Sequence, residues 1–251
     1  MLSKSILKYI QSLHQKKFRD EHSVFIAEGP KVITELLSSG RFICKMICAL
    51  DDFINENEEL LLPVEQKNKL AITEIELEKI SLLHTPNKVV GIFYKKQADE
   101  FVLQQKLNLM LDDIQDPGNM GTIIRIADWF NIKNIICSEN CVEMYNPKVV
   151  QASMGSIARV NVFYKKLEEF IIENKEIDVY AASLNGKSLY SLNNITTGLI
   201  LIGNESKGIN REVLNLVTDQ IIIPRYGGAE SLNAAVATGI ILSHLVYTGT
   251  A

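Results

Sequence analysis

The chain has 251 residues and a formal net charge of −4, with 26 basic against 30 acidic side chains. Its apolar share of 47 % and charged share of 22 % are ordinary for a globular protein. The length allows one large or two modest domains, and the slightly acidic balance argues against a protein that simply coats nucleic acid.

Targeting and metal signals are weak in this sequence. No stretch reaches the roughly 18 apolar residues of a membrane span, and the first 20 residues lack the unbroken apolar core of a secretory signal. We therefore expect a cytoplasmic protein without a membrane segment. The cysteines form two pairs, Cys44/Cys48 and Cys137/Cys141, inside or beside apolar runs. Buried reduced thiols are the expected state, with redox or metal use as the alternative.

Residues 1–97 alternate between helical and strand patterns, which predicts a small α/β sandwich. A helix is expected over residues 3–19, where Ile6, Leu7, Ile10 and Leu13 make one apolar stripe. Strands are expected at 23–29, 42–50, the start of 69–83 and 87–96. Further helices are expected at 30–40, 54–62 and the end of 69–83.

The first predicted helix is strongly basic. Residues 1–19 contain no acidic side chain, and their basic ones are Lys4, Lys8, Lys16, Lys17 and Arg19. One interpretation is a solvated helix face. The other is an edge that contacts the phosphates of a nucleic acid.

A polar stretch at 95–108 predicts a linker, after which the alternation restarts. Strands are expected at 108–114, 131–139, 177–184, 197–205 and 218–224. Helices are expected at 121–130, the first part of 147–160, 211–217 and 231–247. Such alternation predicts a parallel sheet covered by helices on both faces, with ligands beyond the carboxyl ends of its strands.

Three blocks follow strand ends in this second half. The first, DPGNMGTIIRIADWF at 116–130, places Arg125 on an otherwise apolar helix. A charged side chain in such surroundings is normally paired or functional. For this block alone, the alternative explanation is that Arg125 forms an ion pair with Asp128 or Asp116.

The second block, LILIGNESKGIN at 199–210, runs from an apolar strand into a sharp turn. It matches neither a Walker phosphate loop nor a GxGxxG loop, so alone it indicates only a structural turn. The third, at 221–239, leads from Pro224 through a glycine-rich loop to Ser231-Leu232-Asn233 and a helix rich in small residues. Alone, it is typical of a capped, closely packed helix.

Taken together, the blocks resemble the SpoU family of RNA 2′-O-methyltransferases in the SPOUT superfamily. The resemblance rests on N-x-G-x-x-x-R, G-N-E-x-x-G and I-P-x-x-G-x-x-x-S-L-N in that order, and it covers about residues 107–246. It extends to NPKVVQASMGSIARV, where Gln151 stands at a position at which the family commonly has an arginine. The chain thus lacks that side chain for an RNA or interface contact.

The N-terminal part also resembles a family feature. FIAEGPKVITELLSSG is similar to the substrate-binding domain of many SpoU enzymes, a ribosomal-protein-like RNA-binding sandwich, and this match covers about residues 20–97. The resemblance implies two domains. Residues 1–104 would bind RNA and include the linker, and residues 105–251 would form an α/β methyltransferase domain with a parallel sheet and a deep trefoil knot.

In this family the knot loops hold S-adenosylmethionine in a bent shape, and no metal is used. The enzymes are usually homodimers with the site at the subunit interface. The positions that the resemblance assigns to cofactor binding, largely through backbone groups, are Leu184, Gly203, Asn204, Gly208, Ile223, Pro224, Ser231 and Leu232.

The resemblance implies transfer of a methyl group to a ribose 2′-hydroxyl. The matching catalytic set is Asn119, Arg125, Glu205, Ser231 and Asn233. A guanidinium stays protonated, so we expect Arg125 to stabilise the developing alkoxide or hold a phosphate rather than act as base. Glu205 would orient Arg125 or Asn119, and Ser231 and Asn233 would fix the loop and substrate.

The expected substrate is 23S ribosomal RNA. Two alternatives remain: methylation of transfer RNA, and a non-catalytic RNA-binding protein that keeps the methyltransferase fold. An ordinary Rossmann enzyme is disfavoured because the chain has no GxGxxG loop.

Overall fold

The computed structural model describes residues 2–96, 106–192 and 195–249. By their contacts these residues form two compact units. The first consists of the residues up to 96 together with Tyr145–Ala158, and the second of the remaining described residues. Most of the predicted linker, and the predicted boundary between residues 104 and 105, lie outside the described residues.

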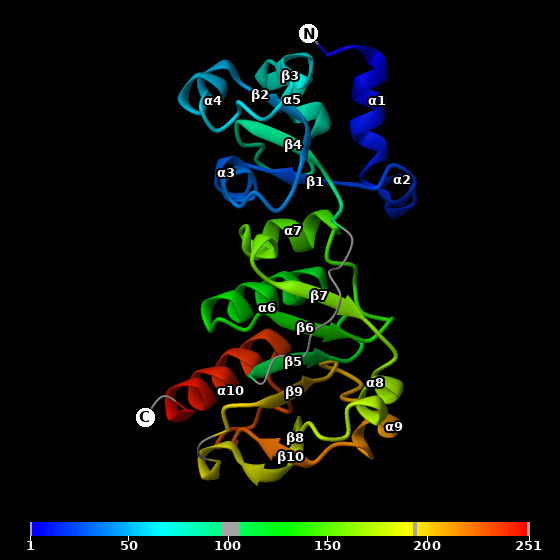
Figure 1. Ribbon diagram of the computed structural model, residues 1–251, viewed down its shortest axis with the longest axis vertical. Coiled ribbons are helices and arrows are strands. Elements are labelled where there is room, and N and C mark those ends of the chain that lie inside the picture. Colours follow the sequence, from blue (N-terminus) through cyan, green and yellow to red (C-terminus); the bar gives the residue numbers. More distant parts are fainter. Residues whose placement is uncertain (1, 97–105, 193–194, 250–251) are drawn as a thin grey trace. The chain divides into compact units, whose positions relative to one another are not determined.

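The first unit is built on a mixed sheet of order β1-β4-β2-β3, in which β4 is antiparallel to β1 and β2, and β3 is parallel to β2 (Figure 1). Its strands are β1 (Val24–Glu28), β2 (Cys44–Ala49), β3 (Lys69–Ala71) and β4 (Val89–Tyr94). Its helices are α1 (Lys4–Ser12), α2 (Lys16–Glu21), α3 (Pro30–Ser38), α4 (Asp51–Glu56), α5 (Glu74–Ile80) and α7 (Pro147–Ser153), with short 3-10 turns η1 (Gln66–Asn68) and η2 (Ser156–Ala158).

The prediction of one helix over residues 3–19 is wrong, because the chain turns between α1 and α2. Arg19 explains the turn. Its side chain is 2 % exposed, and Nη1 donates to the carbonyls of Leu13 and His14 at 3.0 Å each. Arg19 therefore satisfies backbone groups at the end of α1 and belongs to neither a solvated face nor a phosphate-contacting edge.

The second unit confirms the predicted parallel sheet. Its order is β10-β8-β9-β5-β6-β7, and every neighbouring pair is parallel. The strands are β5 (Leu107–Leu111), β6 (Asn134–Cys137), β7 (Asn161–Tyr164), β8 (Val179–Ser188), β9 (Gly198–Ile202) and β10 (Asp219–Ile222). The helices are α6 (Pro117–Trp129), α8 (Leu167–Glu173), α9 (Arg211–Leu214) and α10 (Ala234–Gly249), with the 3-10 turn η3 (Leu189–Ser191).

Helices cover this sheet in two pairs. Figure 1 shows α6 and α10 together on the left and α8 and α9 together on the right. The pair α8 and α9 buries Phe170 and Val213 against strand residues such as Met110 and Leu201. A parallel sheet needs such cover because its strands are apolar on both faces. A trefoil knot depends on how the chain threads through its own loops. The order of the strands does not test this threading, so the knot stays a prediction.

Three asparagines cross the sheet at one register. Asn134 donates to Oδ1 of Asn108 at 3.3 Å, and Asn161 donates to Oδ1 of Asn134 at 3.2 Å. Asn108 and Asn134 are 2 % and 4 % exposed. This ladder links β5, β6 and β7 through side chains, and each amide satisfies the next in a place that water hardly reaches.

All four cysteines are free thiols, and three of them are buried. In the described part of the chain, no helix is both long and apolar enough to cross a membrane.

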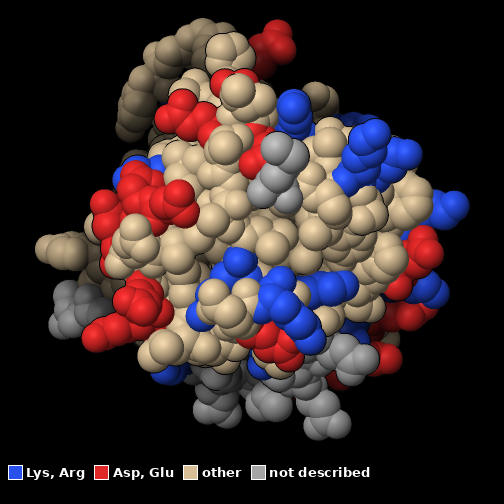
Figure 2. Space-filling model, turned by 90° about the horizontal axis from the view of Figure 1, so that it is seen from above, with Lys and Arg blue, Asp and Glu red and all other residues tan. Residues whose placement is uncertain are grey.

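Figure 2 shows one face on which many acidic side chains gather at the left and many basic ones at the lower centre and upper right.

Candidate active site

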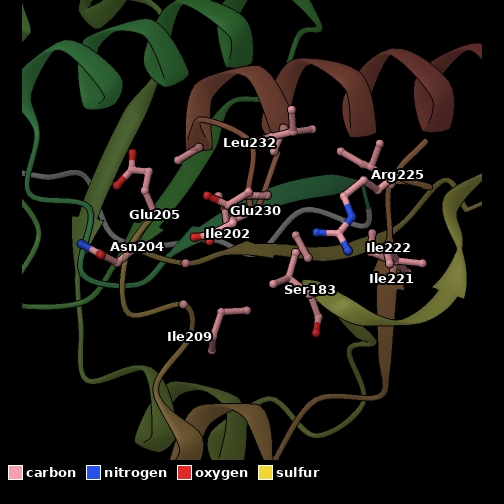
Figure 3. Close-up of a pocket in the computed structure, with 18 of the residues that line it drawn as sticks. Ser183, Ile202, Asn204, Glu205, Ile209, Ile221, Ile222, Arg225, Glu230 and Leu232 are labelled. Atoms are coloured by element: carbon pink, nitrogen blue, oxygen red, sulfur yellow. The ribbon is translucent and has the colours of Figure 1, made fainter. Parts of the chain in front are cut away.

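A cavity of about 650 Å³ lies in the second unit, beside the carboxyl ends of β9 and β10 and the middle of β8 (Figure 3). Its volume falls within the range of about 300–1,000 Å³ that is typical of small-molecule sites. Parallel sheets place ligands at this edge. The eight predicted cofactor positions all line the cavity. Their contact with a cofactor stays a prediction.

The cavity wall is mainly apolar. Ile202, Ile209 and Ile221 line it, as do Leu184 and Leu232, which are 67 % and 45 % exposed. The backbone of the loop 223–232 forms none of the turn, loop or cap hydrogen bonds that join backbone groups elsewhere in the described residues. The cavity therefore offers apolar side chains, together with backbone groups that are not used in secondary structure, to a ligand that has both kinds of surface.

The loop after β9 is tightly folded around Gly203. A Cβ atom there would lie 2.6 Å from the carbonyl carbon of Gly208 and from Cγ1 of Ile209, so only glycine fits. The backbones of Asn204 and Gly208 exchange two hydrogen bonds of 3.1 and 2.9 Å, and Gly208 has φ +71°. This second block is a compact loop whose closure depends on its glycines.

Two aspartates that sequence reasoning missed anchor this loop to the end of β5. The Asn204 amide donates to the carbonyl of Asp113 at 2.9 Å, and Lys207 Nζ lies 2.9 Å from the Asp113 carboxylate. The backbone N–H of Asn210 donates to Asp112 Oδ2 at 2.7 Å. Their signal in the sequence is a pair of carboxylates directly after a buried apolar strand.

The first and third blocks meet the second in a chain of side-chain hydrogen bonds. The Asn119 amide donates to Oε1 of Glu205, and Asn233 donates to Oδ1 of Asn119 at 2.8 Å. The Asn233 Oδ1 atom accepts from the backbone N–H groups of Ala235 and Val236 at 3.0 and 3.2 Å, which fixes that side chain at the start of α10. Asp116 caps α6 by accepting from the Asn119 N–H at 2.7 Å.

This chain of three residues joins the cavity to a second hollow. Glu205 lines the cavity, whereas Asn119 and Asn233 line an open groove of about 790 Å³ between α6 and α10. The groove is otherwise largely apolar, with Val236 50 % and Tyr247 76 % exposed. A polar cluster therefore stands where the two hollows meet.

The two remaining catalytic candidates lie differently. Ser231 lines the cavity, but Arg125 is exposed on α6 and lines neither hollow. Neither ion pair considered for Arg125 is present among the described residues, because Asp128 pairs with Arg159 at 2.9 Å and Asp116 caps α6. Arg125 shares its helix face with Trp129, which lies four residues further along α6 and is 84 % exposed.

Two charged residues of the third block also enter the site and were missed from sequence. Arg225 and Glu230 line the cavity, and Figure 3 shows the Arg225 side chain directed into it. Arg225 Nη1 donates to the carbonyl of Ala229 at 3.2 Å, a contact within its own loop. The signal in the sequence that indicates these two residues is the presence of charged side chains inside a glycine-rich loop.

Comparison with known proteins agrees with this geometry. Residues 106–243 match the model of the SpoU rRNA Methylase family, and residues 4–91 match the MRM3-like substrate binding domain. The chain belongs to the SpoU rRNA methylase family. It is an S-adenosylmethionine-dependent RNA methyltransferase.

Three relatives illustrate the match. The 23S rRNA (guanosine(2553)-2′-O)-methyltransferase RlmP of Bacillus subtilis (strain 168) is 26 % identical, over 94 % of this chain and 93 % of its own. An AdoMet-bound rRNA methyltransferase from Sinorhizobium meliloti is 30 % identical, with TM-score 0.86 over 97 % and 95 % of the two chains. The SpoU methyltransferase AviRb from Streptomyces viridochromogenes, 22 % identical, shares the fold with TM-score 0.85 over 98 % of each chain.

Proposed function

We propose that this SpoU enzyme methylates a ribose 2′-hydroxyl of 23S ribosomal RNA in the cytoplasm. The observation that carries the proposal is the hydrogen-bonded chain Glu205–Asn119–Asn233, which stands between a cofactor-sized cavity and an open groove. The choice of 23S RNA is supported by the Bacillus subtilis relative, which this chain matches over 93 % of that protein's length.

S-adenosylmethionine fits the cavity by its chemistry. Its adenosine needs apolar walls and backbone hydrogen bonds, which Leu184, Leu232 and the loop 223–232 supply. Its amino-acid end carries an ammonium and a carboxylate, and Glu230 and Arg225 offer the opposite charges. We assign Gly203, Asn204, Gly208, Ile223, Pro224 and Ser231 to the backbone cradle, within the knotted loops that the family resemblance implies.

The bound cofactor supplies an activated methyl group and a neutral leaving group, so the protein's task is positioning and charge stabilisation. The Glu205 carboxylate fixes the Asn119 amide, and Asn233 fixes its oxygen. Asn119 thereby presents one orientation to a ribose at the junction. A protonated Arg125 would stabilise the alkoxide that develops as the 2′-hydroxyl loses its proton.

Arg125 reaches that junction most simply from a second copy of the chain. It lies on the α6 face with exposed Trp129, next to the groove that exposes Val236 and Tyr247. Exposed apolar surface of this kind marks an interface. In the proposed homodimer, the α6 and α10 faces of two copies pack together, and each Arg125 side chain lies at the cavity of the partner chain.

Residues 1–104 form the RNA-binding domain with its linker, and residues 105–251 form the methyltransferase domain.

The proposal is tested by mapping 2′-O-methyl groups in total RNA from cells with and without the gene. Loss of one methyl group from 23S RNA, restored by the wild-type gene and not by Glu205→Gln, is the expected result. Loss from a transfer RNA, with ribosomal RNA unchanged, would replace the proposed substrate.

A further inference from the structure

A β-bulge in the first unit redirects one lysine. In the β2–β4 ladder Cys44 pairs with Phe93, and the next paired residues are Met46 and Ile92. Lys45 is therefore the extra residue on β2. Bulges of this kind re-aim a side chain and are frequent beside functional sites.

The redirected Lys45 side chain is held between two tyrosines. Its Nζ atom donates to the Tyr9 hydroxyl at 2.9 Å, and it lies 5.0 Å from the centre of the Tyr9 ring and 5.5 Å from that of Tyr94. No carboxylate pairs with Lys45 in the part of the chain that the structure describes. Since an ammonium has three protons, two remain for another acceptor.

Aromatic surface is exposed around this ammonium. Tyr94 is 42 % exposed, and His22 is exposed and packs edge-on against Tyr9 with ring centres 5.1 Å apart. We call Tyr9, His22, Lys45 and Tyr94 the Lys45 platform. The helices that contribute Tyr9 and precede His22 also carry the exposed lysines Lys4, Lys8, Lys16 and Lys17. The platform thus combines exposed rings with positive charge that no ion pair neutralises among the residues the structure describes.

We propose that the Lys45 platform binds an unpaired nucleotide of the RNA substrate, with a phosphate on Lys45 and the base against Tyr94 or His22. Exposed rings beside basic side chains are the chemistry by which proteins hold single-stranded RNA. A paired base is stacked between its neighbours and has no free face for a ring. The inference rests on the proposed function only in that the substrate is RNA.

The test measures binding of a short fluorescein-labelled oligouridine, and of an RNA duplex of equal length, to the full chain by anisotropy at several salt concentrations. Tyr94→Leu should weaken oligouridine binding about tenfold and leave duplex binding unchanged, since stacking contributes about 1–3 kcal/mol per base. Lys45→Met should weaken oligouridine binding and lower the salt slope by about 0.7. Lys67→Met, which removes an exposed lysine paired with Glu65, is the matched charge control.

Each variant is also checked by thermal unfolding, because the platform joins α1 to the sheet. His22→Ala, at an exposed position, and Lys45→Arg, which keeps the charge, guard against a folding defect. His22→Ala should weaken binding and Lys45→Arg should largely keep it. Oligouridine affinity equal to wild type in Lys45→Met, Tyr94→Leu and His22→Ala would overturn the proposal. The binding assay contains no methyl donor. Its outcome for the Lys45 platform would therefore stand even if the enzyme did not methylate 23S RNA.

Discussion

The amide of Asn119 donates a hydrogen bond to the carboxylate of Glu205, although 86 residues separate the two along the chain. Asn119 lies in the first turn of α6, and Glu205 lies in the loop closed by Gly203 and Gly208. The bond joins the wall of the cavity to the helix that borders the groove. The relative position of the two hollows therefore depends on this contact and on its extension to Asn233.

Glu205→Gln tests the contact with the least change of shape. A neutral amide replaces the carboxylate, so the hydrogen bond that Asn119 donates loses its charge assistance and holds the Asn119 amide less firmly. We expect kcat to fall about 100-fold or more, as for loss of one preorganised polar group in an active site. S-adenosylhomocysteine affinity, measured by calorimetry, should stay within a few-fold of wild type. Unchanged kcat would contradict the assigned role of Glu205.

Arg125→Ala should abolish methyl transfer while leaving cofactor binding nearly intact, because Arg125 does not line the cavity. If Arg125 acts across a dimer, mixing Arg125→Ala with Glu205→Gln chains restores activity. Random exchange makes half of the dimers mixed, each with one intact site, so about a quarter of wild-type activity should return. No recovery after verified exchange would show that Arg125 serves its own chain.

Local patterns predicted most elements of the parallel sheet, and the family resemblance predicted the eight cofactor positions that line the cavity. Strand ends such as Ile202–Gly203 and Ile223–Pro224 are marked by apolar runs followed by turn residues. Neither β7, with four residues, nor α8, with seven, is predicted from the sequence, because such short elements show little periodicity. The turn before α2 was missed because it depends on where the buried Arg19 side chain points.

The contacts that organise the site had no local signal. The bonds of Asn119 to Glu205 and to Asn233 span 86 and 114 residues, and nothing near Asn119 indicates either partner. Asp112 lies inside the predicted strand 108–114, and its role appears only when Asn210 folds back to it. Family resemblance grouped the catalytic residues, whereas the structure shows which of them touch.

The asparagine ladder predicts a large stability effect at Asn134. Asn134→Ala removes the middle amide, so Asn108 Oδ1 loses a donor and Asn161 Nδ2 loses an acceptor. Losing these two hydrogen bonds between side chains that water hardly reaches should lower the free energy of unfolding by about 1–3 kcal/mol. Urea denaturation measures the change, with exposed Asn215→Ala as the control. Equal stability of the two variants would mean that water replaces the ladder.

Burial raises the pKa of the Cys44 and Cys48 thiols to about 12. Only the thiolate reacts with iodoacetamide, so at pH 8 the reactive fraction is about a thousandfold smaller than for a thiol of pKa 9. In the native protein both cysteines should be alkylated slowly, and the rate should rise about tenfold per pH unit up to pH 10. In urea both should react rapidly. Fast native labelling followed by mass spectrometry would contradict this assignment.

The charges of Arg225 and Glu230 are assigned to the amino-acid end of the cofactor, and ligand truncation separates this role from general loop stability. S-adenosylhomocysteine carries that end, and 5′-methylthioadenosine lacks it. Arg225→Met should weaken binding of the first about tenfold or more, since a hydrogen bond to a charged group contributes about 1.5–3 kcal/mol. Binding of the second should not change, because no carboxylate faces residue 225.

Lys187→Met provides the control for charge, since Lys187 pairs with Asp219 and does not line the cavity. It should bind both ligands as wild type does. If Arg225→Met weakened both ligands equally, Arg225 would instead support the loop through its bond to Ala229. Glu230→Gln gives the complementary test. The Glu230→Gln variant should bind S-adenosylhomocysteine more weakly than wild type does. Its binding of an analogue that keeps the carboxylate and lacks the ammonium should not change.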